Sequence, residues 1–116
     1  MRKTIAAALT AAAVLLAGGR ASAQLVPPAY PAKVFVTVDS VQVVEYRVVV
    51  TGILQGDAAP STYSVQSNVA GTQPAFAQNC QQQALLAMAK PGQYLLELYS
   101  AGSLTSSTCK LTRVNP

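Results

Sequence analysis

The first 23 residues constrain the fold most, because they have the pattern of a secretory signal that is removed from the mature chain. Two basic residues follow the initial methionine, and an uncharged, alanine-rich run extends to residue 16. Ala21 and Ala23 are the small residues that a signal peptidase recognises, which predicts cleavage before Gln24. The apolar run is shorter than the roughly 20 residues that span a bilayer. An uncleaved anchor or a buried helix is the alternative, and the pattern favours the signal.

Removal of the signal takes 23 of the 116 residues and leaves a mature chain large enough for one small domain. Three of the eight Lys and Arg residues leave with it, so five cations face four carboxylates and the net charge falls from +4 to +1. The remaining cations are not clustered, which argues against nucleic acid as a partner and against an anionic lipid surface. We expect a periplasmic or secreted protein with no stable membrane insertion after cleavage. The residue after the cleavage site is not cysteine, which argues against a lipid-modified N-terminus.

The chain has two cysteines, Cys80 and Cys109, and both lie in the mature part. Oxidising compartments preserve disulfides, so export predicts a bond between the two. A closed loop of about 30 residues is worth about 3.5 kcal/mol in the chain-entropy model. A redox-active or catalytic thiol is the alternative, but neither cysteine belongs to a Cys-x-x-Cys motif and the chain has no histidine. We therefore expect a structural disulfide with Cα atoms about 5–6 Å apart.

Residues 24–32 contain three prolines, which lack the amide donor that a central strand needs. This proline-rich leader is interpreted as a flexible tail in preference to a polyproline recognition segment. The single domain then covers residues 33–116.

Residues 33–54 are rich in β-branched and aromatic residues, which favour strands. Turn-forming Asp39 and Ser40 divide the stretch into two predicted strands, 33–38 and 41–54, and Gly52 marks a bulge in the second. Alternation predicts one inward face in the second strand, made of Val44, Tyr46, Val48, Val50 and Leu54. Its opposite face mixes charged and apolar groups, as expected for an antiparallel sheet with one buried side.

A weaker strand is predicted at 62–66, with Tyr63 and Val65 inward. The helix is predicted over 74–90, because Pro74 suits a first helical position and Lys90-Pro91-Gly92 is a typical end. Its buried arc is predicted to comprise Phe76, Cys80, Ala84, Ala87 and Met88. Asn79, Gln82, Gln83 and Leu86 lie outside that arc. The glutamines are interpreted as a solvent-facing stripe, with a polar contact surface as the alternative.

Two more strands are predicted, at 93–100 with Tyr94, Leu96 and Leu98 on one face, and at 104–114 with Cys109 and Leu111 together. A hairpin turn at 101–103 joins them. The order is βββαββ, which predicts an α+β fold: a twisted antiparallel sheet of four to five strands with one helix on one face and one disulfide.

The residue types needed for most catalytic chemistry are missing. Without histidine, the commonest general base and transition-metal ligand are absent. The carboxylates are scattered: Asp39 and Asp57 lie in predicted turns, and Glu45 and Glu97 lie on outward strand faces. No glycine-rich phosphate loop or calcium loop is present. The sequence therefore predicts no cofactor, no metal and no catalytic residue.

We accordingly expect a non-catalytic exported domain, a protein-binding or envelope-structural module of the kind found in bacteria. The candidate partner surface is the second sheet face, comprising Val43, Val49, Ile53, Leu95 and Tyr99. Two alternatives stay open: a small hydrolase using carboxylates or a serine, and a small-molecule carrier with its ligand between helix and sheet.

Overall fold

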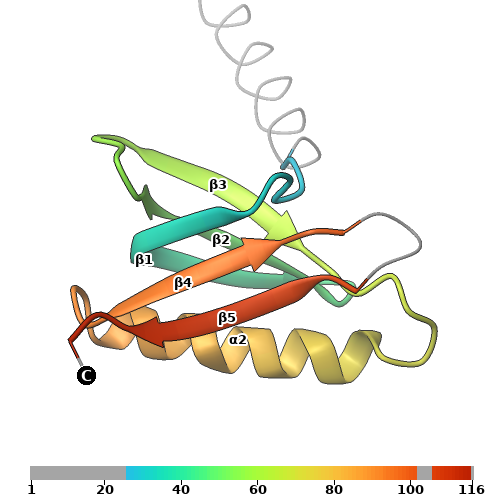
Figure 1. Ribbon diagram of the computed structural model, residues 1–116. Coiled ribbons are helices and arrows are strands. Elements are labelled where there is room, and N and C mark those ends of the chain that lie inside the picture. Colours follow the sequence, from blue (N-terminus) through green and yellow to red (C-terminus); the bar gives the residue numbers. More distant parts are fainter. Residues whose placement is uncertain (1–25, 102–105, 116) are drawn as a thin grey trace, which may run out of the picture.

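The computed structural model describes residues 26–101 and 106–115, which form a twisted, open antiparallel sheet covered on one face by a helix (Figure 1). The predicted α+β fold and the order βββαββ are confirmed. The elements are β1 (Lys33–Val44), β2 (Arg47–Leu54), β3 (Pro60–Val65), α2 (Gln73–Ala89), β4 (Tyr94–Tyr99) and β5 (Thr108–Arg113). Within the described residues the strands are arranged in the order β3-β2-β1-β4-β5. The predicted signal cleavage site at Ala21, Ala23 and Gln24 lies outside the described residues.

β1 joins the two halves of the sheet. It pairs with β2 along Phe35 to Val44, but with β4 only along Lys33 to Phe35. Register shifts between Phe35 and Thr37 and between Val38 and Ser40 mark two bulges in the β1–β2 ladder. Bulges bend a strand and increase its twist. The β4–β5 hairpin therefore turns away from the β1–β2–β3 meander instead of continuing a flat sheet.

The first hairpin turn lies at Glu45 and Tyr46, and the prediction of a turn at Asp39-Ser40 is wrong. Glu45 and Tyr46 have φ values of 50° and 66°, and Val44 pairs with Arg47 on either side of them. A two-residue turn with both φ values positive matches the right-handed twist of a hairpin. Glycine and asparagine normally carry such turns, so the Glu-Tyr pair gave no turn signal. The long second strand of the prediction is thus the end of β1 followed by β2.

The hairpin also changes which residues share a face. Val48 and Val50 are fully buried, as predicted, but Tyr46 is exposed in the turn. Directly opposite residues in an antiparallel pair share a face, so Val44 shares the outer face with its partner Arg47. The predicted bulge at Gly52 lies on the neighbouring strand: Gly52 pairs with Val38, next to the shift at residues 38–40 of β1.

The core lies between the sheet and α2. Its largest fully buried side chains are Phe35, Leu96, Leu98, Val48, Val50 and Val65. The helix contributes small groups to this layer, namely Ala77, Cys80, Ala84 and Ala87. Met88, predicted to be buried, is 37% exposed, and Ala77 occupies the inner face instead. Small residues let the helix approach the sheet closely, and the larger sheet residues fill the space between them.

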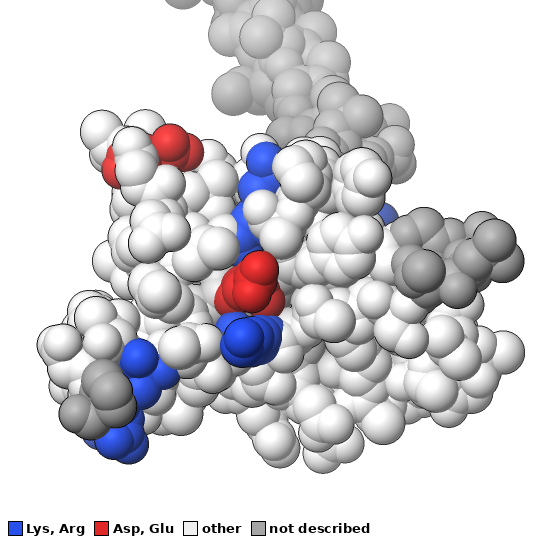
Figure 2. Space-filling view, viewed as in Figure 1, with Lys and Arg blue, Asp and Glu red and all other residues white. Residues whose placement is uncertain are grey.

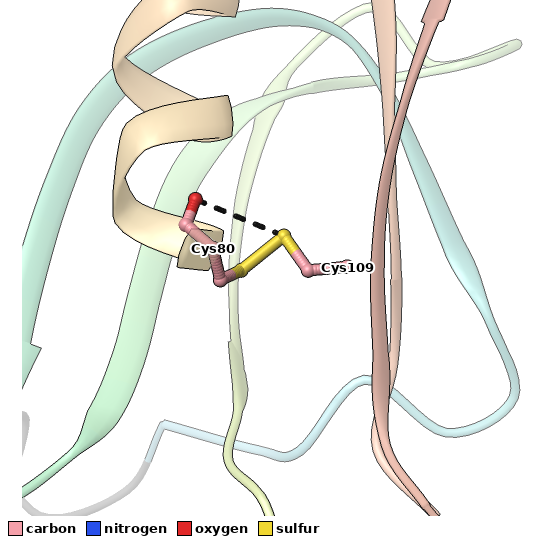
Figure 3. Close-up of a disulfide and its surroundings, with 2 residues drawn as sticks. All are labelled: Cys80 and Cys109. Atoms are coloured by element: carbon pink, nitrogen blue, oxygen red, sulfur yellow. Dashed lines mark hydrogen bonds between the residues drawn. A yellow bond between two sulfur atoms is a disulfide. The ribbon is translucent and has the colours of Figure 1, made fainter. Parts of the chain in front are cut away.

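The predicted disulfide joins α2 to β5, with Cα atoms 5.5 Å apart (Figure 3). Cys80 leaves from the buried helix face, and Cys109 pairs with the buried Leu98 on the inner sheet face. The Sγ atom of Cys109 also lies 3.8 Å from the carbonyl oxygen of Cys80. A disulfide sulfur carries no hydrogen, so this is a packing contact. Cys109 is only partly buried, which places the bond at the edge of the core.

The leader packs against the fold at residues 27–30, so the interpretation as a free tail is wrong for this part. The amide of Ala29 donates to the Ser64 carbonyl oxygen at 2.8 Å, and the Ser64 amide donates to the Pro27 carbonyl oxygen at 3.0 Å. The Ser100 amide donates to the Ala29 carbonyl oxygen at 2.8 Å, and Ala29 is fully buried. The leader therefore connects the outer edge of β3 with the end of β4.

The last two strands are shorter than predicted. Pairing between β4 and β5 runs from Tyr99–Thr108 to Tyr94–Arg113. The connection between the strands is therefore longer than the predicted tight turn at 101–103, of which residues 102 and 103 lie outside the described part. Its described ends are anchored, because the Ala101 amide donates to Ser107 Oγ at 3.1 Å and Asn68 Nδ2 donates to the Ala101 carbonyl oxygen at 2.8 Å.

Candidate interaction surface

The outward side of α2 is the least ordinary surface of the molecule, because this helix carries no charged residue between Gln73 and Ala89. A helix on a domain surface usually presents charged residues to water. Here Leu85 is 42% exposed, and Leu86 and Met88 are each 37% exposed. The small side chains of the helix face the sheet, while its large aliphatic side chains face outward.

Local propensity accounts for the helix without charges. Its interior consists mainly of Ala, Gln, Leu and Met, which are good helix formers. Proline occupies a first-turn position, and the amide of Lys90 donates to the Leu86 carbonyl oxygen at 3.1 Å at the other end. Gly92, with φ of 83°, then reverses the chain toward β4. The outward leucines are thus not needed to form the helix or to pack it on the sheet.

We define the outer face of α2 as seven exposed residues at helical spacing. They are Ala75, Gln78, Asn79, Gln82, Leu85, Leu86 and Ala89. The amide side chains lie in the N-terminal half and the aliphatic ones in the C-terminal half, where Met88 borders them. The aliphatic half of this face lacks the charged side chains that a solvent-facing helix normally presents. The outer face is therefore the best candidate for contact with another molecule.

The structure does not place all five residues of the predicted partner surface on the same face of the sheet. Val43 pairs with the buried Val48 and so lies on the helix-facing side, which corrects its predicted place on the second face. Val49 is on the second face but only 9% exposed. Ile53, Leu95 and Tyr99 are half-buried. The register thus keeps these four on one face without making them a fully exposed apolar patch.

Tyr99 has a specific neighbour in the leader. Its ring centroid lies 5.9 Å from that of Tyr30, which is 66% exposed. The pair lies next to the Ala29–Ser100 hydrogen bond, so the leader covers the end of β4. Tyr99 therefore serves the attachment of the leader, a role that strand alternation could not indicate.

The carboxylates are distributed over four places. Glu45 and Asp57 lie beyond opposite ends of the eight-residue strand β2, which corresponds to a separation of about 25 Å. Asp39 is exposed in the bulged part of β1, and Glu97 on β4 pairs with Lys110 of β5. Figure 2 shows the acidic groups on this side as separate patches, one of them next to basic groups. Among the described residues no three His, Cys, Asp or Glu side chains are placed to hold a metal ion.

A surface hollow of about 420 Å³ lies where the α2–β4 connection meets the end of β5. Lys90 and Arg113 line it together with Tyr94, Gln93 and Asn115. These side chains can donate hydrogen bonds and include two cations, so the hollow attracts anions. It opens to solvent between the ends of elements and does not enter the space between helix and sheet, where the carrier hypothesis places a ligand.

One sequence feature of the outer face of α2 is not captured by helical periodicity. Helical periodicity correctly places Leu86 and the amides outside the buried arc, but by itself it predicts only an ordinary solvated surface there. The informative feature is the absence of Lys, Arg, Asp and Glu over 17 residues. Which leucines are outward depends on the packing of the helix against β1 and β5.

Among the described residues, no helix is long and apolar enough to cross a membrane. The disulfide is compatible with an extracellular location. Comparison of the chain with protein-family models, curated proteins and solved structures finds no match. The residues and their arrangement therefore carry the evidence on function.

Proposed function

We propose that this protein is an exported, non-catalytic binding module that contacts another protein in the periplasm or outside the cell through the outer face of α2. The main observation behind this proposal is that the outward side of α2 has no charged residue and leaves Leu85 and Leu86 partly exposed. Full burial of an exposed leucine contributes about 1.5–3 kcal/mol, and because Leu85 and Leu86 are 42% and 37% exposed, covering each contributes about 1 kcal/mol without breaking ion pairs.

Three further observations support the proposal. The N-terminal sequence predicts export, and the disulfide suits an oxidising compartment. The chain has no histidine, and Glu45 and Asp57 lie beyond opposite ends of β2, so these observations do not favour the carboxylate-dependent hydrolase. The helix is also braced against the sheet by the disulfide, which gives the contact surface a fixed orientation.

Site-specific photocrosslinking in an exporting host tests the proposal. A benzophenone side chain at position 86 is expected to form a light-dependent adduct with a protein. The same group at Thr112, an exposed position on the other sheet face, serves as the matched control and should form none. Equal adduct formation at both positions, or none at position 86, would overturn the proposal.

A second variant checks that the contact needs the apolar surface. Leu86→Glu places a charge on the outer face, and the adduct from a benzophenone at Gln82 should then disappear. Because Leu86 is outside the core, the thermal midpoint should change by less than about 3 °C. Persistence of the adduct in the folded variant would show that binding does not depend on the apolar side chains, which contradicts the proposal.

A further inference from the structure

We infer that a hollow beside the start of β1 binds a small zwitterion, namely an amino acid or short peptide that carries a free ammonium and a free carboxylate group. The hollow has a volume of about 390 Å³, which is within the usual range of ligand sites, about 300–1,000 Å³. None of its lining residues belongs to α2, so this inference does not depend on the proposed function. The lining residues that carry it are Lys33, Leu54, Gln55, Asp57, Ser61 and Tyr63.

Two side chains of opposite charge, Lys33 and Asp57, line this hollow without pairing with each other. Among the described residues neither has an ion-pair partner, and Lys33 Nζ lies 4.8 Å from the ring centroid of Tyr63. Lys33 is half-buried, and its backbone is fixed opposite Leu98 in the β1–β4 ladder. A ligand with a single charge is attracted by one of these groups and repelled by the other. A zwitterion can place its carboxylate at Lys33 and its ammonium at Asp57, so both charges gain a partner.

The backbone on the acidic side of the hollow is already ordered. The Gln55 amide donates to the Val34 carbonyl oxygen at 2.8 Å, which ties the end of β2 to β1. The Asp57 amide donates to the Leu54 carbonyl oxygen at 3.0 Å and closes a four-residue turn. Gly56, with φ of 89°, occupies the third position of that turn, where a positive φ favours glycine. The ligand therefore meets a preformed loop and loses little affinity to loop ordering.

The remaining lining groups suit a peptide-like ligand better than a bare ion. The side chains of Gln55 and Ser61 have no hydrogen-bond partner among the described residues, so they can bond the amide or carboxylate atoms of the ligand. Leu54 and Tyr63 are half-buried and add apolar surface on which an aliphatic side chain can pack. An amino acid with an aliphatic side chain, alone or at the start of a short peptide, therefore matches both the polar and the apolar parts of the hollow.

Titration of the purified, disulfide-bonded protein with a series of zwitterions, followed by amide NMR shifts and calorimetry, tests this inference. The probes are leucine, leucylglycine and leucylglycylglycine, whose charged ends lie progressively farther apart. At least one should bind with a dissociation constant below about 1 mM, the weak end of specific binding. Its N-acetyl and C-amide derivatives, which each lack one charge, should bind at least tenfold more weakly. The probe that binds most tightly shows whether the site takes a free amino acid or a peptide.

Variants at the two charges separate the roles of the two ends of the ligand. Lys33→Gln should remove the preference for the free carboxylate over the amide and keep the preference for the free ammonium over the N-acetyl derivative. Asp57→Asn should have the reverse effect. Asp39→Asn is the matched control, because Asp39 is exposed on β1 and does not line the hollow, and it should change affinity less than twofold. Thermal unfolding of each variant checks that it is folded.

Failure of all three zwitterions to saturate the protein at about 10 mM overturns the inference, and so does a derivative that binds as tightly as its parent. If the Lys33 and Asp57 variants weaken every probe equally, the two charges do not recognise the two ends of the ligand, and the inference is also wrong. The adduct from position 86 tests the outer face of α2 separately, so none of these results decides the proposed function.

Discussion

At the scale of single residues, Gly52 is the described glycine at which the fold leaves least room for a side chain. A Cβ atom built on Gly52 would overlap the backbone carbonyl oxygen of Thr37 and lie 3.0 Å from the Cα atom of Val38. Both contacts are with the bulged part of β1, where backbone cannot move aside as a flexible side chain does. The bulge and the glycine opposite it are therefore a matched pair.

Gly52→Ala is accordingly expected to reduce the free energy of unfolding by about 3 kcal/mol, since overpacking against backbone is costly. Gly56→Ala is the control, because Gly56 has φ of 89° but nothing within 4 Å of an added Cβ. That change should cost only about 1 kcal/mol of backbone strain. Urea unfolding of both variants measures the difference. Equal losses would mean that the β1 bulge yields and that close approach is unimportant here.

At the scale of elements, the disulfide makes α2 and the edge strand β5 one unit. β5 has no strand on its outer side in the described sheet, so its position depends on the β4 ladder and on the link to the helix. The bond also holds the helix whose outer face is the proposed contact surface. Loss of the bond should therefore loosen the surface as well as the fold.

Replacing both Cys80 and Cys109 with Ser should cost about 2–5 kcal/mol of folding stability, the usual range for a small disulfide-bonded domain. Thermal unfolding of the double variant against the wild type measures this loss, and thiol titration of the unfolded, unreduced wild type should find no free thiol. A double variant of unchanged stability that has lost partner binding would instead assign the cysteines a direct functional role.

At the scale of the whole molecule, the N-terminal segment carries most of the net charge and the predicted export signal. The full chain has a net charge of +4, but most of this excess belongs to the residues before the predicted cleavage site. The mature domain is close to neutral, with its few charges on strands, turns and helix ends. A near-neutral domain with an uncharged helix meets a partner with little long-range electrostatic repulsion.

Protein recovered from an exporting host should therefore begin at Gln24 and migrate with a less basic isoelectric point than the calculated value of 9.3 for the full chain. Intact-mass analysis gives the first residue directly, and replacing Ala23 with a bulky residue should block processing. A mass that includes the first 23 residues would show that the segment is kept, and the account of an exported mature domain would then be wrong.

The sequence by itself determined the element order, the helix and the disulfide of this protein, because these depend on local signals. Period-2 and helical patterns each arise within one segment, and Pro74 and Gly92 mark helix ends through their own backbone preferences. The cysteine pairing followed from there being only two cysteines. The candidate surface on α2 was partly readable in the same way, since helical phase already placed Leu86 outside the core.

The tertiary structure decided what depends on contacts between distant segments. The hairpin at Glu45-Tyr46 forms against local preference, because pairing of β1 with β2 compensates for two positive φ values, and it moved Val43 to the helix-facing side. Burial of Ala29 depends on hydrogen bonds to β3 and to Ser100 beyond β4. The close packing of small helix residues on the sheet leaves the leucines outside. No local pattern contains these contacts, since each joins residues that are far apart in the chain.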